Sequence, residues 1–213
     1  MAPQVKICGI TNLVDAELAA GHGAWALGVI FAADSPRRCD PEAATEIASV
    51  LRRRTEVVGV FVNAVLDELV ATAQTVGLTM LQLHGEEGPS YCAEARRRSG
   101  LPVIKAARVR DAAAVRALSA YRTDFHLLDA HIEGARGGTG QTFDWSLAAT
   151  HRGKPPLMLS GGLTPDNVQE GIATVRPFAV DVASGVEASP GRKDPEKLSQ
   201  FFEAVRAATP ATV

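Results

Sequence analysis

The chain has 213 residues, 46% of them hydrophobic, and a formal net charge of −2. This length and apolar content fit one domain with a sizeable core, spanning residues 1–213. The near-neutral charge excludes a broad basic surface for nucleic acid or for an anionic membrane. No run of about 18 apolar residues occurs, so we expect no membrane-spanning segment.

The three cysteines, Cys8, Cys39 and Cys92, form an odd set without metal-ligand spacing. Such a set is typical of a reducing intracellular compartment. The segment MAPQVKICGI at the N-terminus has a single lysine and no long apolar stretch, so we expect no signal peptide. These observations predict a soluble cytoplasmic protein.

Along the chain, short apolar runs alternate with helical patterns at intervals typical of one βα unit. The strand candidates are VKICGI (5–10), AWALGVIF (24–31), VVGVFV (57–62), MLQLHG (80–85), PVIKAA (102–107), FHLLDA (125–130), LMLSG (157–161) and FAVDVAS (178–184). The clearest helical patterns cover 41–53, 66–77, 164–175 and 194–208. The last of these begins with an acidic residue and proline, as helices often do.

Strands that are apolar almost throughout are covered on both faces, which indicates a parallel sheet. Eight such units without a second domain predict an α/β fold, a (β/α)₈ TIM barrel near its lower size limit. An open doubly wound sheet is the alternative. Its dinucleotide-binding form is disfavoured because no GxGxxG follows the first strand.

Several polar residues lie at the ends of predicted strands, where barrel active sites form. Cys8 follows the first strand, Gln82 and His84 end the fourth, Asp129 ends the sixth, and Asp181 lies within the eighth. A cysteine is often a small buried apolar residue, and an aspartate at a strand end often caps a turn. Their joint placement on one face nevertheless predicts a catalytic site.

Two long connections also follow strand ends, 32–40 with SPRR and 130–144 with GGTG. Both are candidates for lids over the site, the alternative being ordinary surface loops. Within the first loop, Arg37 and Arg38 are either a binding group or a solvated pair.

Lys6 lies two residues before Cys8 and therefore on the same side of the sheet. It either lowers the pKa of the thiol or pairs with a carboxylate on a strand.

Glycine turns follow the last two strands, at 159–162 (LSGG) and 183–186 (ASGV). In barrels, the loops after the seventh and eighth strands frequently hold a phosphate group. Backbone N–H groups and helix N-termini at such turns favour an anion, although glycines also serve simply to make tight turns. The residues expected at this phosphate site are Gly161, Gly162, Ser184 and Gly185.

As an ordered set, the motifs of this chain resemble those of phosphoribosylanthranilate isomerases, enzymes of tryptophan biosynthesis. The motifs are KICGIT (6–11), SPR (35–37), QLHGEE (82–87), LLDA (127–130), GGTGQTFDW (137–145), LSGGLTPDNV (159–168), VDVASGVE (180–187) and PGRKD (190–194). Ala183 stands where the family often has serine, and Gln141 where lysine is common.

The resemblance implies a cofactor-free, metal-free Amadori rearrangement of N-(5-phosphoribosyl)anthranilate to 1-(2-carboxyphenylamino)-1-deoxyribulose 5-phosphate. It implies that Cys8 is the general base and Asp129 the general acid. Arg37 would bind the anthranilate carboxylate, with Arg38 as the adjacent alternative. His84 and Asp181 match further active-site positions that contact the substrate. The expected partner is a small phosphorylated molecule, and the chain is either a monomer or a homodimer.

Three other functions share parts of this pattern. The related sugar isomerases of histidine biosynthesis use aspartates for both proton transfers, so Cys8 argues against them. A metal-dependent pentose phosphate epimerase needs clustered His and Asp ligands, whereas the five histidines here are scattered. A non-catalytic sensor of phosphorylated metabolites would keep the fold and the phosphate site without needing an acid and a base.

Overall fold

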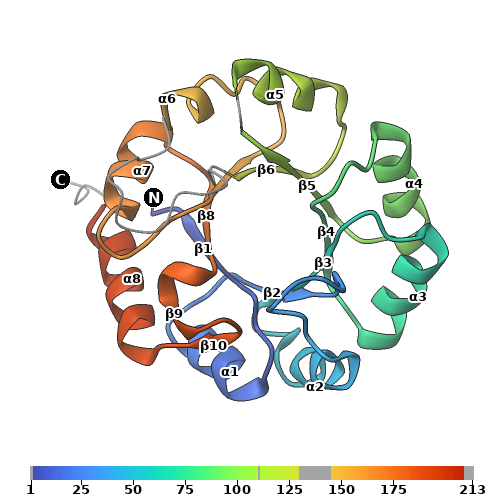
Figure 1. The fold of residues 1–213 in the computed structure, drawn as a ribbon, viewed down its shortest axis with the longest axis horizontal. Helices are drawn as coiled ribbons and strands as arrows, with labels where there is room; N and C mark the ends of the chain where they lie inside the picture. The colour runs from blue at the N-terminus through green and yellow to red at the C-terminus, as the bar shows by residue number, and fades with distance from the viewer. Residues whose placement is uncertain (1, 110, 130–144, 209–213) are drawn as a thin grey trace.

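The computed structural model describes residues 2–109, 111–129 and 145–208. Eight parallel strands close into a barrel in the order β1 to β8, and helices surround it (Figure 1). The strands are β1 (Gln4–Cys8), β2 (Ala26–Ile30), β3 (Glu56–Phe61), β4 (Met80–Leu83), β5 (Val103–Arg108), β6 (Phe125–Asp129), β7 (Leu157–Ser160) and β8 (Ala179–Val182). The predicted (β/α)₈ barrel is confirmed, and the open sheet is excluded.

The helices alternate with these strands. They are α1 (Leu13–Gly21), α2 (Pro41–Leu51), α3 (Leu66–Val76), α4 (Pro89–Ser99), α5 (Ala112–Ala117), α6 (Trp145–Ala148), α7 (Val168–Val175) and α8 (Pro195–Ala207), with short 3₁₀ helices η1 (Leu118–Ala120) and η2 (Ser184–Val186). A small hairpin, β9 (Glu187–Ser189) and β10 (Arg192–Lys193), lies between η2 and α8 and was not predicted. In the described part of the chain, no helix is both long and apolar enough to cross a membrane.

Local chemistry explains where the helices begin. The Asp40 and Asp194 side chains accept backbone hydrogen bonds at the starts of α2 and α8, and each is followed by proline. The helix predicted over 164–175 begins only at Val168. Before it, the Asn167 side chain accepts from the Thr164 N–H and donates to the Gly162 carbonyl, which stabilises a turn instead.

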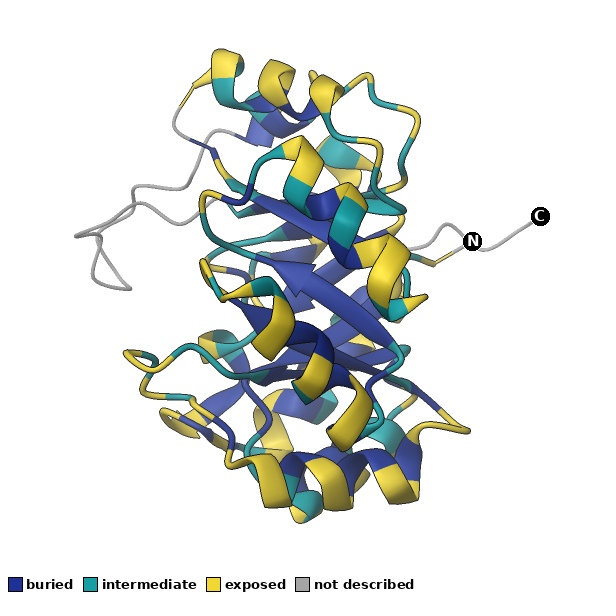
Figure 2. Cartoon of the chain, turned by 90° about the vertical axis from the view of Figure 1, so that its right-hand side faces the viewer, coloured by how far each residue is buried: buried dark blue, intermediate teal, exposed yellow. Residues whose placement is uncertain are grey.

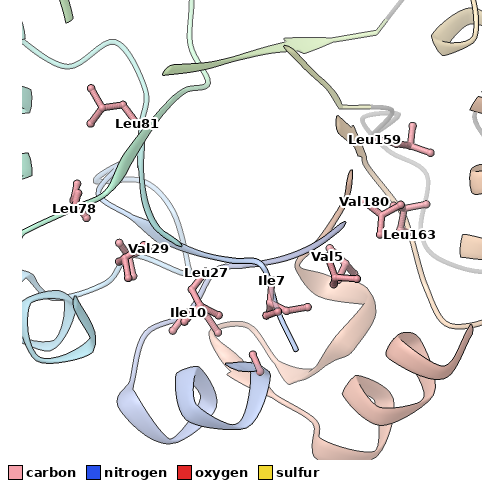
Figure 3. Close-up of a cluster of buried hydrophobic side chains, with 14 of the residues drawn as sticks. Val5, Ile7, Ile10, Leu27, Val29, Leu78, Leu81, Leu159, Leu163 and Val180 are labelled. Atoms are coloured by element: carbon pink, nitrogen blue, oxygen red, sulfur yellow. The ribbon is translucent and has the colours of Figure 1, made fainter. Parts of the chain in front are cut away.

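The apolar core has two parts. The larger part lies between the outer faces of the strands and the helices, where Figure 3 shows side chains such as Ile7, Leu27 and Val180. Figure 2 shows the same arrangement from the side, with buried strands inside and exposed helix faces outside. The smaller part fills the inside of the barrel and consists of Ala26, Val58, Met80, Ile104, Ala106, Leu127, Met158 and Ala179.

Three aromatic rings pack together at the N-terminal ends of the strands. Trp25 lies 5.6 Å from Phe125 and 5.5 Å from Phe178, and the two phenylalanines lie 5.4 Å apart, measured between ring centroids. At the other end, the inside of the barrel carries polar side chains, including the buried residues Lys6 and Asp181. The barrel therefore has an apolar floor and a polar mouth.

Two histidines pair on the outer side of β6. His126 is fully buried, its Nδ1 lies 2.9 Å from Nε2 of His151, and its Nε2 lies 3.3 Å from the Tyr121 carbonyl oxygen. Burial, together with His151, lowers the pKa of His126 to about 4. Burial also lowers the pKa of His151. Both rings are therefore neutral in the folded protein at neutral pH.

We expect this histidine pair to make the fold acid-sensitive. Since the unfolded chain binds protons more readily below pH 6.5, stability should fall as the pH drops from 6.5 to about 4. This gap corresponds to about 3 kcal/mol. Urea denaturation at several pH values measures the effect, and His126→Gln should flatten the dependence relative to the wild type. An equally steep dependence in His126→Gln would contradict the expectation.

Candidate active site

A cavity of about 260 Å³ opens at the C-terminal end of the barrel. Eight of the nine predicted site residues line it, namely Cys8, Arg37, His84, Asp129, Gly161, Gly162, Asp181 and Ser184. A larger hollow of about 400 Å³ beside β5 and α5 shares His84 but contains neither Cys8 nor Asp129. The loop 130–144, with its GGTG and Gln141, lies outside the described residues.

The thiol of Cys8 packs beside Lys6 and against β2. A β-carbon added to Gly28 would lie 2.8 Å from the Cys8 sulfur and 2.9 Å from the Lys6 nitrogen. Only glycine therefore leaves room for both groups at this position. The sequence signal for this contact is a glycine inside an otherwise apolar strand, which often marks a close approach of another group. Gly28 was not among the predicted site residues.

Lys6 pairs with a strand carboxylate, and its charge acts on Cys8 without lowering the pKa of the thiol overall. Its ammonium group is fully buried and lies 2.9 Å from Oδ1 of Asp181, whose Oδ2 accepts a 3.0 Å hydrogen bond from the Ser160 hydroxyl. The same ammonium group lies beside the Cys8 thiol, since both pack against Gly28. Burial raises the pKa of the Cys8 thiol, and the Lys6 charge opposes that rise only in part. The pKa of Cys8 is thus raised in the free protein.

The second proton-transfer candidate, Asp129, is linked to β4 through a histidine. His84 Nε2 lies 3.2 Å from Oδ2 of Asp129, and the buried Gln82 places its amide nitrogen 3.0 Å from His84 Nδ1. With Gln82 donating to Nδ1, the hydrogen of a neutral His84 is on Nε2 and points to Asp129. Gln82 therefore orients the histidine that contacts Asp129.

The turn that carries His84 is held by a buried ion pair not identified from the sequence. The Glu87 carboxylate accepts from the backbone N–H groups of Asn63 and Gly85, each at 2.8 Å, and from the Lys105 ammonium at 2.9 Å. Burial raises the pKa of Glu87, but Lys105 and these N–H groups outweigh it, and the pKa is lowered. The motif QLHGEE thus supplies both a site residue and its support.

Of the two adjacent arginines, Arg37 lines the cavity, whereas Arg38 is exposed to solvent. The Arg37 side chain is 22% exposed and is bound by the buried Glu187 carboxylate. Nε of Arg37 lies 2.9 and 3.0 Å from the two carboxylate oxygens, and Nη2 lies 2.7 Å from Oε2. Glu187 was not among the predicted site residues.

The two glycine turns come together. Gly161 and Gly162 have φ angles of 93° and 65°, which favour glycine. Gly185 packs so closely on the Leu163 carbonyl oxygen that any side chain would collide with it. The expected helix N-terminus does not directly follow Gly162, because α7 begins at Val168. After β8, the only helical segment before the hairpin is the short 3₁₀ helix η2.

Among the described residues, no three His, Cys, Asp or Glu side chains are placed to hold a metal ion.

Comparison with known proteins agrees with this geometry. The sequence profile described as N-(5'phosphoribosyl)anthranilate (PRA) isomerase matches residues 5–204. N-(5'-phosphoribosyl)anthranilate isomerase of Citrifermentans bemidjiense is 53% identical over 199 residues, 93% of this chain and 95% of that protein. Phosphoribosyl anthranilate isomerase of Thermotoga maritima superposes with a TM-score of 0.89 at 43% identity, covering 96% and 99% of the two chains.

Another structure of this kind of isomerase is in complex with reduced 1-(o-carboxyphenylamino)-1-deoxyribulose 5-phosphate. It superposes with a TM-score of 0.86 at 41% identity, over 96% of this chain and 99% of that one. Profile, relatives and structures thus agree along nearly the whole chain, and they confirm the resemblance of the motifs. This chain belongs to the N-(5'-phosphoribosyl)anthranilate isomerase family and is an isomerase.

Proposed function

We propose that the chain converts N-(5-phosphoribosyl)anthranilate to 1-(2-carboxyphenylamino)-1-deoxyribulose 5-phosphate, with Cys8 as general base and Asp129 as general acid. The observation that carries the proposal is the single cavity lined by this thiol, this carboxylate, Arg37 and the glycine turns. The substrate has one anionic group at each end and a sugar between them. Arginine and the turns are suited to the ends, and the acid and base to the sugar.

The acid acts first. Protonated Asp129 gives its proton to the ribose ring oxygen, the bond from that oxygen to C1 breaks, and the anthranilate nitrogen forms an iminium with C1. For this, the pKa of Asp129 must rise from its reference value of about 3.9. The substrate's own negative charge favours such a rise.

The base acts second. The iminium acidifies the hydrogen on C2, and the Cys8 thiolate takes that proton to leave an enolamine, which tautomerises to the ketone. Burial disfavours the thiolate, but the Lys6 ammonium and the positive charge of the iminium favour it. Each proton transfer of this kind contributes about 10² to 10⁴-fold to the rate.

The direct test is to incubate the protein with N-(5-phosphoribosyl)anthranilate and follow the loss of anthranilate-type fluorescence. Catalytic turnover supports the proposal, and binding without turnover would instead identify a sensor.

We propose that the reaction needs no metal or organic cofactor, so dialysis against a chelator should leave the rate unchanged. We place the reaction in the cytoplasm because Cys8, which is not disulfide-bonded, must remain reduced to act as a base.

Arg37→Ala should raise KM for the substrate and lower kcat/KM by about tenfold or more, because a guanidinium bound to a carboxylate contributes about 1.5 to 3 kcal/mol. Arg38→Ala is the matched control, since its side chain is exposed, and it should change kcat/KM little. Steady-state kinetics measure both. A larger loss in Arg38→Ala would move the carboxylate contact one residue along the loop.

Gly162→Asp should raise KM at least about tenfold, because it brings a carboxylate to the proposed phosphate site. Nothing lies within 4 Å of a β-carbon added there, so the fold should survive despite the φ of 65°. Gly162→Asn is the control, since asparagine has the same shape and tolerates this backbone conformation without adding charge. If both variants have the same KM, the phosphate binds elsewhere.

A further inference from the structure

Beside the site lies a group of three charged side chains, Arg37 from the loop after β2 and the buried Glu187 and Lys193 from the β9–β10 hairpin. Glu187 begins β9 and Lys193 ends β10, and they are only 6% and 5% exposed. Neither lines the cavity, but Glu187 binds both the Lys193 ammonium, at 3.0 Å, and the guanidinium of Arg37. A buried carboxylate with two cationic partners is costly to assemble, which indicates a role in the site beyond stability.

The contacts use one particular edge of the Arg37 guanidinium. Glu187 takes the Nε hydrogen and one Nη2 hydrogen, as the distances of 2.9, 3.0 and 2.7 Å show. A guanidinium has five N–H donors in a rigid plane. Among the described residues, the guanidinium bonds only Glu187, so the edge formed by Nη1 and the remaining Nη2 hydrogen is available there for a second carboxylate, in a bidentate arrangement.

The charges of the group also suit a second carboxylate. Glu187 alone would neutralise Arg37, but the Lys193 ammonium adds a second positive charge, so the three ionised side chains together carry a net charge of +1. Burial lowers the pKa of Lys193, and the adjacent Glu187 carboxylate opposes that shift and favours the ammonium form. Burial raises the pKa of Glu187, but Arg37 and Lys193 more than offset this, so the pKa is lowered and the carboxylate is ionised. Arg37 is thus held by a carboxylate without losing its attraction for another anion.

Lys193 connects this group to the rest of the site. Its ammonium also donates to the Cys8 carbonyl at 2.6 Å and to the Ala183 carbonyl at 3.2 Å. One side chain therefore contacts the end of the strand that carries the base, the start of the second glycine turn, and the carboxylate that binds Arg37.

We propose that Glu187 is a positioning residue that holds Arg37 by its Nε edge and turns the outer edge toward the substrate's carboxylate, while Lys193 preserves the positive charge needed for that contact. The inference rests on the proposed function, in which Arg37 binds the anthranilate end. It adds Glu187 and Lys193, which lie outside the cavity, as the residues that determine the orientation and charge of the Arg37 guanidinium.

The test is Glu187→Gln, which keeps the shape of the side chain and removes its charge. We expect KM to rise about tenfold with kcat changed far less, and inhibition by free anthranilate to weaken by a similar factor. Inhibition by inorganic phosphate should remain unchanged. Glu46→Gln, which removes the same charge from an exposed position on α2, is the control and should leave KM, kcat and both inhibition constants unchanged.

A double-mutant cycle separates this inference from the proposed function. If Glu187 acts through Arg37, Arg37→Ala combined with Glu187→Gln should resemble Arg37→Ala alone. Additive losses, or equal weakening of phosphate and anthranilate inhibition, would overturn the positioning role. If Arg37→Ala itself leaves anthranilate inhibition unchanged, the carboxylate assignment fails instead. Should Glu187→Gln not fold, Glu187→Asp retracts the carboxylate while keeping its charge, and it should show the same selective loss.

Discussion

Cys8→Ser is expected to lower kcat by about 10² to 10⁴-fold while KM changes little. Serine has nearly the size of cysteine and fits the space left by Gly28, but its hydroxyl is a far weaker acid than a thiol and does not form a useful base. Steady-state kinetics measure the loss. Cys92→Ser is the matched control, because Cys92 is also buried but lies on α4 outside the cavity, and it should keep its kcat.

The pH dependence gives an independent check on the same residue. Wild-type activity should fall at low pH, where the base is protonated. Since burial raises the pKa of Cys8, this decline should occur at higher pH than for an exposed thiol. If Cys8→Ser turns over at nearly the wild-type rate, the base is another group and the proposed mechanism is wrong at that step.

Asp129→Asn should likewise cost about 10² to 10⁴-fold in kcat. Asparagine keeps the shape of aspartate but has no carboxylic proton to give to the ring oxygen, so ring opening slows while binding at the two ends of the substrate persists. Asp124→Asn, at the opposite end of the β6 region, removes a carboxylate outside the cavity and should retain activity. Near-normal turnover in Asp129→Asn would eliminate the residue as the acid.

The fold could be predicted well because each strand is apolar almost throughout and ends near a polar or glycine residue. The strand predicted over 125–130, for example, is observed as Phe125–Asp129. The hairpin β9–β10 was missed because its strands are three and two residues long and have no apolar alternation. The late start of α7 was missed because it depends on hydrogen bonds of Asn167 rather than on periodicity.

The residues of the candidate site likewise fall into those that the sequence predicts and those that it does not. Cys8 and Asp129 could be proposed because strand ends converge in a barrel whatever the helices do. Glu187 could not be proposed, because its partner Arg37 is 150 positions away and no local sequence pattern links the two residues. Gln82 lies at a predicted strand end, but no sequence pattern indicates its contact with His84. Local sequence thus identifies groups that face the mouth of the barrel and does not identify the residues that hold them.

The hydrogen bond between Lys6 and Asp181 joins residues 175 positions apart, across the contact between β1 and β8, where the first and last strands of the barrel pair (Figure 1). During synthesis, the ammonium group beside the base therefore has no carboxylate partner until the eighth strand has been made. Contacts of such long sequence separation form late and slowly. The surroundings of the proposed base are thus complete only once β8 has paired with β1 and the barrel has closed.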